Sequence, residues 1–331
     1  MSVSAVIPVH NRADLIEKLL ATVRLQTVPF DEILVIDNAS ADSAAQVAAD
    51  AGCNVIAMGR NAGFAAAVNR GWQAAKGEWV AILNSDVELD AHWLERLLEG
   101  VGPASFATGK VLSAANPTLI DGTYDLLSRS GCAWRAGHGQ PDIASDQTSV
   151  EKTKPISIAP GTACLFRRAV LAQLNGLDES YDSYLEDVDL GLRCLGAGFT
   201  GVYVPTARAW HHGSATFGRW NPAVVRLISR NQLTLISRHY DRALFRSCLW
   251  PIVVGQFLWG LVALRHGAFG AWFAGKREAL ASFHPGGKPS EAMKAFLDAS
   301  ELEIENTATD PYWRLFFRCV PRKTTLGRFD T

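Results

Sequence analysis

Carboxylates crowd together at one place in the sequence, where Glu186, Asp187 and Asp189 fall within four positions. Such carboxylates repel one another, and apolar neighbours such as Leu185 and Val188 add to the cost of ionising them. The combination favours a general base, a carboxylate whose pKa is raised so that it can take a proton from a substrate. A helix start enriched in acids, which the helix dipole stabilises, is the structural alternative.

A second cluster, Asn84, Ser85 and Asp86, has residue types that hold a divalent cation. Hard cations such as Mg²⁺ take carboxylate oxygens and the phosphate oxygens of a substrate as ligands. The adjacent residues His211 and His212 can supply a nitrogen ligand or a phosphate contact, although paired histidines also serve structural roles. Adjacent strand residues point to opposite faces, so only one of the two is expected to face a ligand.

Two further clusters suit a nucleotide. Asp37 comes directly after an apolar run and can accept hydrogen bonds from a base or a ribose, or else hold a turn. Gly63 allows the backbone to approach a ligand closely, and Asn61 either contacts that ligand or caps the following helix. The sequence has neither a G-x-G-x-x-G fingerprint after its first strand nor a G-x-x-x-x-G-K-[ST] P-loop. The clusters therefore favour a nucleoside diphosphate site built without a P-loop.

The elements that must position these residues alternate along the first hundred positions. Expected strands cover 3–9, 32–36, 54–57 and 79–83, and expected helices cover 12–26, 42–50, 61–76 and 90–98. Regularity weakens over 100–160, with a loop or hairpin at 133–140, and returns near 157–159, in helices over 168–174 and 185–195 and in a strand over 201–204. This alternation predicts an α/β fold with a mostly parallel sheet flanked by helices. The polar clusters follow its strands, at the edge where such sheets bind ligands.

Taken together, these residues resemble glycosyltransferase family 2 on the GT-A fold, over about 3–215. Positions 5–12 are similar to the family's opening strand and loop, and Asp37 matches its base-recognising aspartate. Residues 84–86 stand at its D-x-D metal motif, where Asn84 replaces the first acid, and 186–190 match its catalytic acidic motif. The similarity is greatest to bacterial rhamnosyltransferase-like enzymes of cell-surface polysaccharide assembly.

The resemblance implies an inverting enzyme that moves a sugar, with rhamnose as one candidate, from a dTDP- or UDP-sugar to a hydroxyl of a lipid-linked or polysaccharide acceptor. It makes Asp187 the base, beside Glu186 and Asp189. It makes Asp86 and His211 the residues that hold Mg²⁺ or Mn²⁺. The implied donor-binding residues are Pro8, His10, Asn11, Asp37, Asn61, Gly63, Asn69, Asn84, Ser85 and Asp86, and the implied acceptor or sugar contacts are Gly161, Thr162 and Arg230.

Two other classes of protein stay open at this point. A nucleotidyltransferase shares the strand and crevice but usually has a glycine- and lysine- or arginine-rich loop after the first strand, where this sequence has a glycine-free loop at 10–13. A non-catalytic sugar-nucleotide-binding protein would not need both Asp86 and Asp187. Gly161 can also be an ordinary turn residue, and Arg230 can lie on a solvated helix face.

The length of 331 residues suits roughly two domains, and a hydrophobic fraction of 48% excludes wholesale disorder. We place the boundary near 215, between a catalytic domain (1–215) and a helical C-terminal region (216–331). The six cysteines are scattered without metal-ligand spacing and are expected to be reduced. The N-terminus enters an apolar strand without the features of a signal peptide, which predicts a cytoplasmic location.

Charge is divided unevenly along the chain. The net charge of −1 comes from 32 basic and 33 acidic residues, but 219–277 holds nine basic residues and one acid, which leaves 23 basic and 32 acidic residues elsewhere. The same segment contains four tryptophans, and 247–264 has no charged residue. This pattern favours a helix lying on an anionic membrane surface, peripheral on the cytoplasmic face of the inner membrane. A helical subdomain, a homodimer interface and a spanning helix are the alternatives, and nucleic acid is not indicated as a partner.

Overall fold

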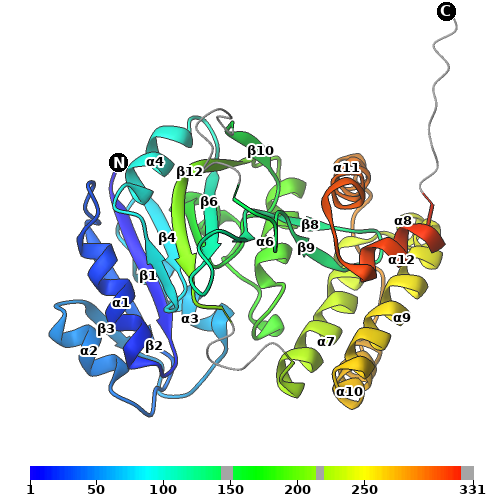
Figure 1. The fold of residues 1–331 in the computed structure, drawn as a ribbon, viewed down its shortest axis with the longest axis horizontal. Helices are drawn as coiled ribbons and strands as arrows, with labels where there is room; N and C mark the ends of the chain where they lie inside the picture. The colour runs from blue at the N-terminus through cyan, green and yellow to red at the C-terminus, as the bar shows by residue number, and fades with distance from the viewer. Residues whose placement is uncertain (143–151, 214–219, 322–331) are drawn as a thin grey trace, which may run out of the picture.

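The computed structural model describes residues 1–142, 152–213 and 220–321, so Arg219 of the basic segment lies outside the described residues. One large sheet is the centre of the fold (Figure 1). Its strands are β1 (Val3–Val9), β2 (Glu32–Asp37), β3 (Asn54–Ala57), β4 (Trp79–Leu83), β5 (Val87–Leu89), β6 (Phe106–Ser113), β7 (Ile120–Gly122), β10 (Lys154–Ile156), β11 (Ala163–Arg167) and β12 (Gly201–His211). A separate hairpin consists of β8 (Asp125–Leu127) and β9 (Ala133–Arg135).

The strand order is β10-β12-β6-β11-β4-β1-β2-β3, with β5 paired to β12 and β7 to β6. β1 is parallel to β2 and β4, β2 to β3, and β12 to β6, whereas β11 is antiparallel to β4 and β6. The sheet is therefore mixed but mostly parallel, as predicted. Because β11 runs the other way, its first residues meet the last residues of β1, β2 and β4 at one edge.

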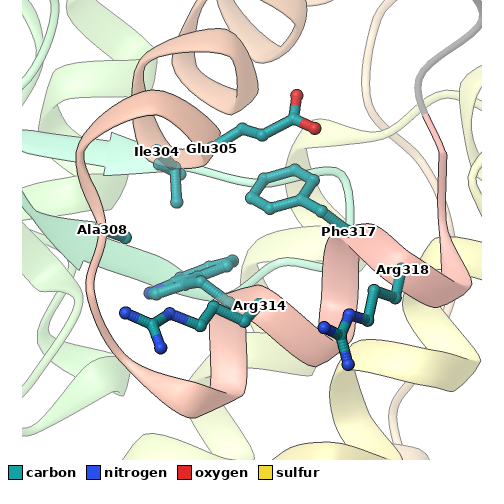
Figure 2. Close-up of a pocket in the computed structure, with 7 residues that line it drawn as sticks. Ile304, Glu305, Ala308, Arg314, Phe317 and Arg318 are labelled. Atoms are coloured by element: carbon teal, nitrogen blue, oxygen red, sulfur yellow. The ribbon is translucent and has the colours of Figure 1, made fainter.

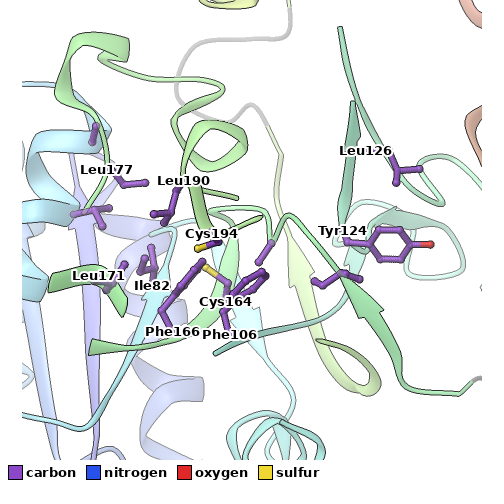
Figure 3. Close-up of a cluster of buried hydrophobic side chains, with 14 of the residues drawn as sticks. Ile82, Phe106, Tyr124, Leu126, Cys164, Phe166, Leu171, Leu177, Leu190 and Cys194 are labelled. Carbon is purple, nitrogen blue, oxygen red and sulfur yellow. The ribbon is translucent and has the colours of Figure 1, made fainter. Parts of the chain in front are cut away.

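Helices cover both faces of this sheet. One face carries α1 (Ala13–Arg24), α2 (Ala44–Asp50) and α4 (Trp93–Gly100), and the other carries α3 (Phe64–Ala74), α5 (Arg168–Gln173) and α6 (Glu186–Gly196). Strand residues alternate between the two cores, so Trp79 and Ala81 pack on the first face and Val80 packs on the second. Figure 3 shows the second core, where Phe166 of β11 lies among Leu171 and Leu190.

The βα units predicted for the first hundred residues are confirmed. The stretch after them holds more strands than its irregular sequence pattern indicated. Six strands, β5, β6, β7, β8, β10 and β11, had not been predicted, and β12 runs seven residues beyond the predicted strand end, to His211. Lys110 explains part of this, because a lysine breaks the apolar pattern of β6 although its side chain is buried on Asp142, with 2.9 Å between Nζ and Oδ1. Helix α3 begins at Phe64 rather than at residue 61, and the N-cap of α2 is Ser43 rather than Asp42.

Six helices follow the sheet. They are α7 (Pro222–His239), α8 (Arg242–Ser247), α9 (Leu249–Arg265), α10 (Phe269–Leu280), α11 (Glu291–Thr307) and α12 (Pro311–Cys319). Leu235 and Tyr240 share a buried cluster with Leu127 of β8 and Val188 of α6, so the C-terminal helices pack against the β8–β9 hairpin and against α6. The division near 215 stays a prediction. Among the described helices, none has the length and apolar character needed to cross a membrane. All six cysteines are free, and four are buried.

Candidate active site

The loops after β1 and β2 lie side by side because Val9 is in register with Asp37. Asp37 Oδ1 accepts a hydrogen bond from the Ser40 backbone N–H at 2.9 Å, and the Ser40 hydroxyl accepts one from the Asn11 N–H at 2.8 Å. Asn11 Oδ1 in turn accepts from the Ala41 N–H at 2.7 Å, while His10 Nδ1 lies 2.9 Å from the Asn38 carbonyl oxygen. The structure thus gathers three of the predicted donor-binding residues, His10, Asn11 and Asp37, on two interlocked turns.

Asn38 is a residue that sequence reasoning passed over. Its side chain is buried, accepts from the Ala62 N–H at 2.8 Å and donates to Asn61 Oδ1 at 3.0 Å and the Gly63 carbonyl at 3.1 Å. It therefore ties the β2 loop to the turn before α3. Gly63 has φ 87°, and a Cβ there would lie 2.7 Å from the carbonyl oxygen of Asp182, so glycine is required both by conformation and by space.

On the other side of this sheet edge, His211 lies between the carboxylates of Asp86 and Asp121. β12 pairs with β5, which follows the 84–86 cluster, and this pairing places His211 Nε2 3.3 Å from Asp86 Oδ1. Nδ1 of the same ring lies 2.9 Å from Asp121 Oδ2. His212 points elsewhere, to Glu88, with 2.7 Å between Nε2 and Oε1. Burial opposes a charge on His211, but its hydrogen bonds to Asp121 and Asp86 outweigh burial and raise its pKa to about 9.

These residues fit a divalent cation that is shared with a substrate. In the described part of the chain no three His, Cys, Asp or Glu side chains form a complete cage. Asp86 and His211 are two adjacent donors, and Asp121 holds the far nitrogen of the ring, as carboxylates commonly do behind a metal-bound histidine. Asn84 Oδ1 is buried without a hydrogen-bond partner. Mg²⁺ typically binds through one or two carboxylates plus substrate phosphates, so the donor set matches a cation completed by a diphosphate.

Asp187 lies in the first turn of α6, where it contacts the residues that lead into β11. Its Oδ2 accepts from the Gly161 N–H at 2.8 Å, and its Oδ1 accepts from the Val188 N–H at 2.8 Å. Thr162, the next residue after Gly161, accepts from the Asn84 N–H through its carbonyl at 2.9 Å. Two consecutive residues thus connect the predicted base to the predicted metal motif.

The backbone around this edge is unusually left-handed. Seven described residues other than glycine have positive φ, and they are Asn11, Arg12, Ala39, Asn175, Asp182, Tyr184 and Leu185. All but Asn175 lie on the loops just described or in the segment directly before Asp187. Residues in this conformation are held there by surrounding contacts and cluster at functional sites. Burial, followed by the charges of Glu186 and Asp86, raises the pKa of Tyr184, which stands in this segment.

The other two acids of the cluster do not resemble Asp187. Glu186 is buried, and burial, followed by the charge of Asp187, raises its pKa well above the ordinary value, while its Oε2 has no partner. Asp189 is buried against α7, where its carboxylate accepts from His239 Nε2 at 2.8 Å and from Arg193 Nε at 2.7 Å. Despite burial, these two contacts lower the pKa of Asp189. The three acids thus differ in their surroundings: Asp187 is held by two backbone N–H groups, Glu186 is buried with an unpartnered oxygen, and Asp189 links α6 to α7.

A buried ion network behind the site comes from the stretch with weak sequence patterns. Arg135 Nε lies 3.2 Å from Asp125 Oδ1, and its NH1 donates to the Thr162 hydroxyl at 3.2 Å and lies 3.9 Å from Asp121 Oδ2. Burial raises the pKa of Asp125 to about 6, although the charge of Arg135 opposes the shift. Gly122 leaves room for Arg135, since a Cβ at residue 122 would lie 2.0 Å from Arg135 Cδ. The sequence feature that could have indicated this network is the pair of acidic residues among apolar ones at 121–127.

Helix α7 holds the segment that leads to Asp187. Asn231 is fully buried, and its Nδ2 donates to the carbonyl oxygens of Tyr181, Ser183 and Tyr184 at 2.7–3.0 Å. Arg230 donates to Asp182 Oδ2 at 3.1 Å and to the Tyr181 carbonyl at 2.8 Å. The predicted phosphate contact of Arg230 is therefore not supported, and neither is a solvated helix face, because its guanidinium is engaged with this loop.

Asn69 also differs from its predicted role. Its Nδ2 donates to the Leu177 carbonyl at 2.8 Å and to Glu179 Oε1 at 2.9 Å, and its Oδ1 accepts from the Leu177 N–H and Trp72 Nε1, both at 2.9 Å. All of its hydrogen-bonding capacity is used inside the protein, so it fastens α3 to the 177–179 loop instead of facing a donor.

Two hollows accompany the fold without enclosing the site. One of about 300 Å³ lies between α11 and α12, lined by Trp313, Arg314 and Phe317 among others, and contains none of the predicted site residues (Figure 2). A second, of about 230 Å³, includes Ala62 and Asn69 next to the Gly63 turn.

A family model described as glycosyl transferase family 2 matches residues 4–174, just over half of the chain. The chain belongs to glycosyl transferase family 2. It is an inverting glycosyltransferase that takes its sugar from a nucleotide-sugar donor, and the nucleotidyltransferase and binding-only alternatives are set aside.

Two relatives are named for the transfer of rhamnose and for O-antigen biosynthesis. An N-acetylglucosaminyl-diphospho-decaprenol L-rhamnosyltransferase of Mycobacterium tuberculosis is 31% identical over 226 residues, which cover 62% of this chain and 74% of the relative. The O-antigen biosynthesis protein RfbC of Myxococcus xanthus is 28% identical over 225 residues, which cover 65% of this chain and 17% of the relative.

Solved structures show the GT-A fold. GalNAc-T7 with UDP, GalNAc and Mn²⁺ matches with a TM-score of 0.59 at 16% identity, over 86% of this chain and 58% of that one. A mannosyltransferase of Pyrobaculum calidifontis with GDP-Man and Mn²⁺ matches with a TM-score of 0.51 at 16% identity, over 96% of this chain and 84% of that one. At this identity the likeness concerns the fold alone.

Proposed function

We propose that Asp187 is the base of this glycosyltransferase and that Asp86 and His211 hold a divalent cation on the donor diphosphate. The observation that carries the proposal is the pair Gly161 and Thr162. Gly161 binds Asp187 through its N–H, and Thr162 binds the backbone of Asn84 through its carbonyl. A general base and a diphosphate site must flank one sugar for a displacement with inversion, and these contacts support that arrangement.

The reaction is a single displacement. The acceptor hydroxyl loses its proton to Asp187, its oxygen forms a bond to the anomeric carbon, and the bond from that carbon to the diphosphate oxygen breaks with its electron pair on the leaving nucleoside diphosphate. Mg²⁺ or Mn²⁺, when bound, supplies charge that stabilises this leaving group. On the protein side, Asp37 and Asn11 form the turns proposed to receive the nucleoside, and Gly161 orients the Asp187 carboxylate.

The substrates are proposed from the relatives. The rhamnosyltransferase of Mycobacterium tuberculosis supports rhamnose as the sugar, carried on dTDP or UDP, and a lipid-linked acceptor. An acceptor in a growing polysaccharide is the second candidate, supported by the O-antigen protein. A lipid-linked acceptor would be met at the cytoplasmic face of the inner membrane.

The test is turnover with a panel of dTDP-, UDP- and GDP-sugars and diphospholipid acceptors, each with Mg²⁺, Mn²⁺ or EDTA. We expect one donor to be preferred, metal-dependent release of nucleoside diphosphate, and a product of opposite anomeric configuration by NMR. Full activity in EDTA would contradict the cation site, and retention of configuration would contradict Asp187 as a base. The variant Glu88→Gln serves as a control, because Glu88 lies two residues beyond Asp86 and pairs with His212 instead.

A further inference from the structure

Helices α9 and α10 expose an unusual set of large apolar side chains. Nine of them, each at least 43% exposed, are Leu249, Trp250, Val253, Phe257, Leu261, Leu264, Phe269, Phe273 and Leu280. We call this set the α9–α10 face. The two helices pack against each other, since a Cβ at Gly260 would touch the ring of Trp272 at 3.0 Å. In Figure 1 they lie at the end of the molecule opposite α1 and α2.

The spacing puts these side chains on one side of each helix. In α9 the exposed positions recur every three or four residues from Leu249 to Leu264, whereas Ile252, Gln256 and Ala263 on the other side are buried. Gln256 Nε2 donates to the Ser130 carbonyl at 2.8 Å, which fixes that side against the β8–β9 hairpin. The inward side of α9 already packs against the protein. The apolar side chains on its outward side are therefore surface residues and not part of the core.

Charge around the α9–α10 face is mostly positive, because the one acid of these two helices, Glu278, pairs with Arg226 of α7, with 2.6 Å between NH1 and Oε2. Between positions 242 and 277 the sequence has no Asp or Glu, and it has five basic residues. Four of these, Arg242, Arg246, Arg265 and Arg277, are exposed, and only Lys276 is buried. Large apolar and aromatic side chains rimmed by arginines suit the boundary between headgroups and acyl chains of an anionic bilayer.

We propose that the α9–α10 face docks on an anionic membrane surface, with its apolar side chains at the acyl boundary and its arginines on lipid phosphates. A second copy of the chain fits less well. In a twofold dimer the same patch meets itself, and here arginines would meet arginines, because the one acid of α9 and α10, Glu278, is already paired with Arg226.

The docking face is one helix away from the base. A Cβ at Gly275 of α10 would lie 2.2 Å from the carbonyl oxygen of Arg226, so α10 packs directly on α7. Helix α7 in turn holds the loop before Asp187 through Asn231. Together with the proposed lipid-linked acceptor, this arrangement brings the base loop near the surface from which such an acceptor would be presented.

The test is flotation of the full chain with vesicles of phosphatidylcholine alone or of equal parts phosphatidylcholine and phosphatidylglycerol. We expect binding to the mixed vesicles and much weaker binding to phosphatidylcholine. The double variant Phe257→Ser/Phe273→Ser should lower the partition coefficient about a hundredfold, since two phenyl groups no longer insert. The double variant Arg265→Glu/Arg277→Glu should remove the preference for phosphatidylglycerol.

The matched control is Leu25→Ser/Leu302→Ser, which removes two exposed leucines outside this face and should float like the wild type. Three results would overturn the proposal: wild-type protein that does not float, a phenylalanine double variant that floats like wild type, or a vesicle-free dimer that this variant dissociates. Flotation is measured without donor or acceptor, so a negative result leaves the proposed sugar transfer to stand or fall on its own assay.

Discussion

The donor side of the site is held by neighbouring loops, whereas the base side is held by residues far apart in the sequence. On the donor side, Asn11 and Asn38 bond to backbone groups of the next turn along the chain and so join consecutive strand–helix units, while Asp37 bonds within its own turn. On the base side, Asp187 depends on Gly161, and its loop depends on Asn231 from the C-terminal helices.

This difference separates two functions. If the proposed site is right, donor-side residues should control the affinity for nucleotide and metal, because they would surround the diphosphate. Base-side residues should control the rate of the chemical step, because they orient one carboxylate. Variants on either side test whether affinity and rate are controlled separately in this way.

The largest effect is expected from Asp86→Ala. It removes the one anionic member of the 84–86 cluster and one carboxylate partner of His211, so kcat/KM should fall by about 10³-fold or more. The measurement is release of nucleoside diphosphate at several concentrations of Mn²⁺. Glu88→Gln should stay within a few-fold of wild type, and equal losses in both variants would deny Asp86 a special role.

Asp121→Asn should act on metal affinity alone. Its carboxylate accepts from His211 Nδ1 and so orients the other ring nitrogen, and such supporting residues typically change metal affinity by about 10–100-fold. The apparent Kd for Mn²⁺, measured by titration of activity, should rise by that factor while kcat at saturating metal changes little. A fall in kcat that excess metal does not restore would place Asp121 on the base side.

Asn231→Leu should lower kcat about tenfold and leave donor affinity unchanged. The variant removes the Asn231 donor from three carbonyls of the loop before Asp187, one of which keeps its bond from Arg230, and this also costs about 2 kcal/mol of unfolding free energy. The matched control is Asn221→Ala, which removes the N-cap of the same helix, costs about 1 kcal/mol and should keep kcat. If both variants lose kcat in proportion to stability, α7 has only a structural role.

The smallest effect concerns stability and not catalysis. Burial lowers the pKa of Lys276 to about 7, and its Nζ donates to the Ser229 carbonyl at 2.7 Å and to Gln232. The unfolded chain then binds more protons than the folded one between about pH 7 and the ordinary lysine value, so Lys276 makes stability rise with pH in that window.

In Lys276→Met this contribution should vanish. The free-energy difference between wild type and variant, from urea unfolding at pH 7 and pH 9, should grow by on the order of 2 kcal/mol in favour of wild type. kcat should be unchanged at both pH values. A constant difference would mean that Lys276 keeps its proton in the fold.

The sequence predicted the residues at the strand ends better than the residues that support them, for a physical reason. Alternating apolar runs determine where β1, β2 and β4 end, and polar residues at those ends, such as Asp37 and Asp86, then share one edge. Arg135 and Asp121 reach the site only through pairing of short strands in 120–135, where neither periodicity nor turn residues indicate a partner. Asn69 and Arg230 were misjudged because their partners lie more than 40 positions away.

Asp187 as the base is central to the proposed mechanism. The most direct test compares kcat for Asp187→Asn with kcat for Glu186→Gln at saturating donor and metal. Asn keeps the shape of Asp187 but takes no proton, so kcat should fall about 10³-fold with the donor Kd unchanged. Glu186 is buried with Oε2 unpartnered, so Gln, which keeps its shape, should replace it within about tenfold. The opposite ranking, with Asp187→Asn active and Glu186→Gln inactive, would contradict the assignment.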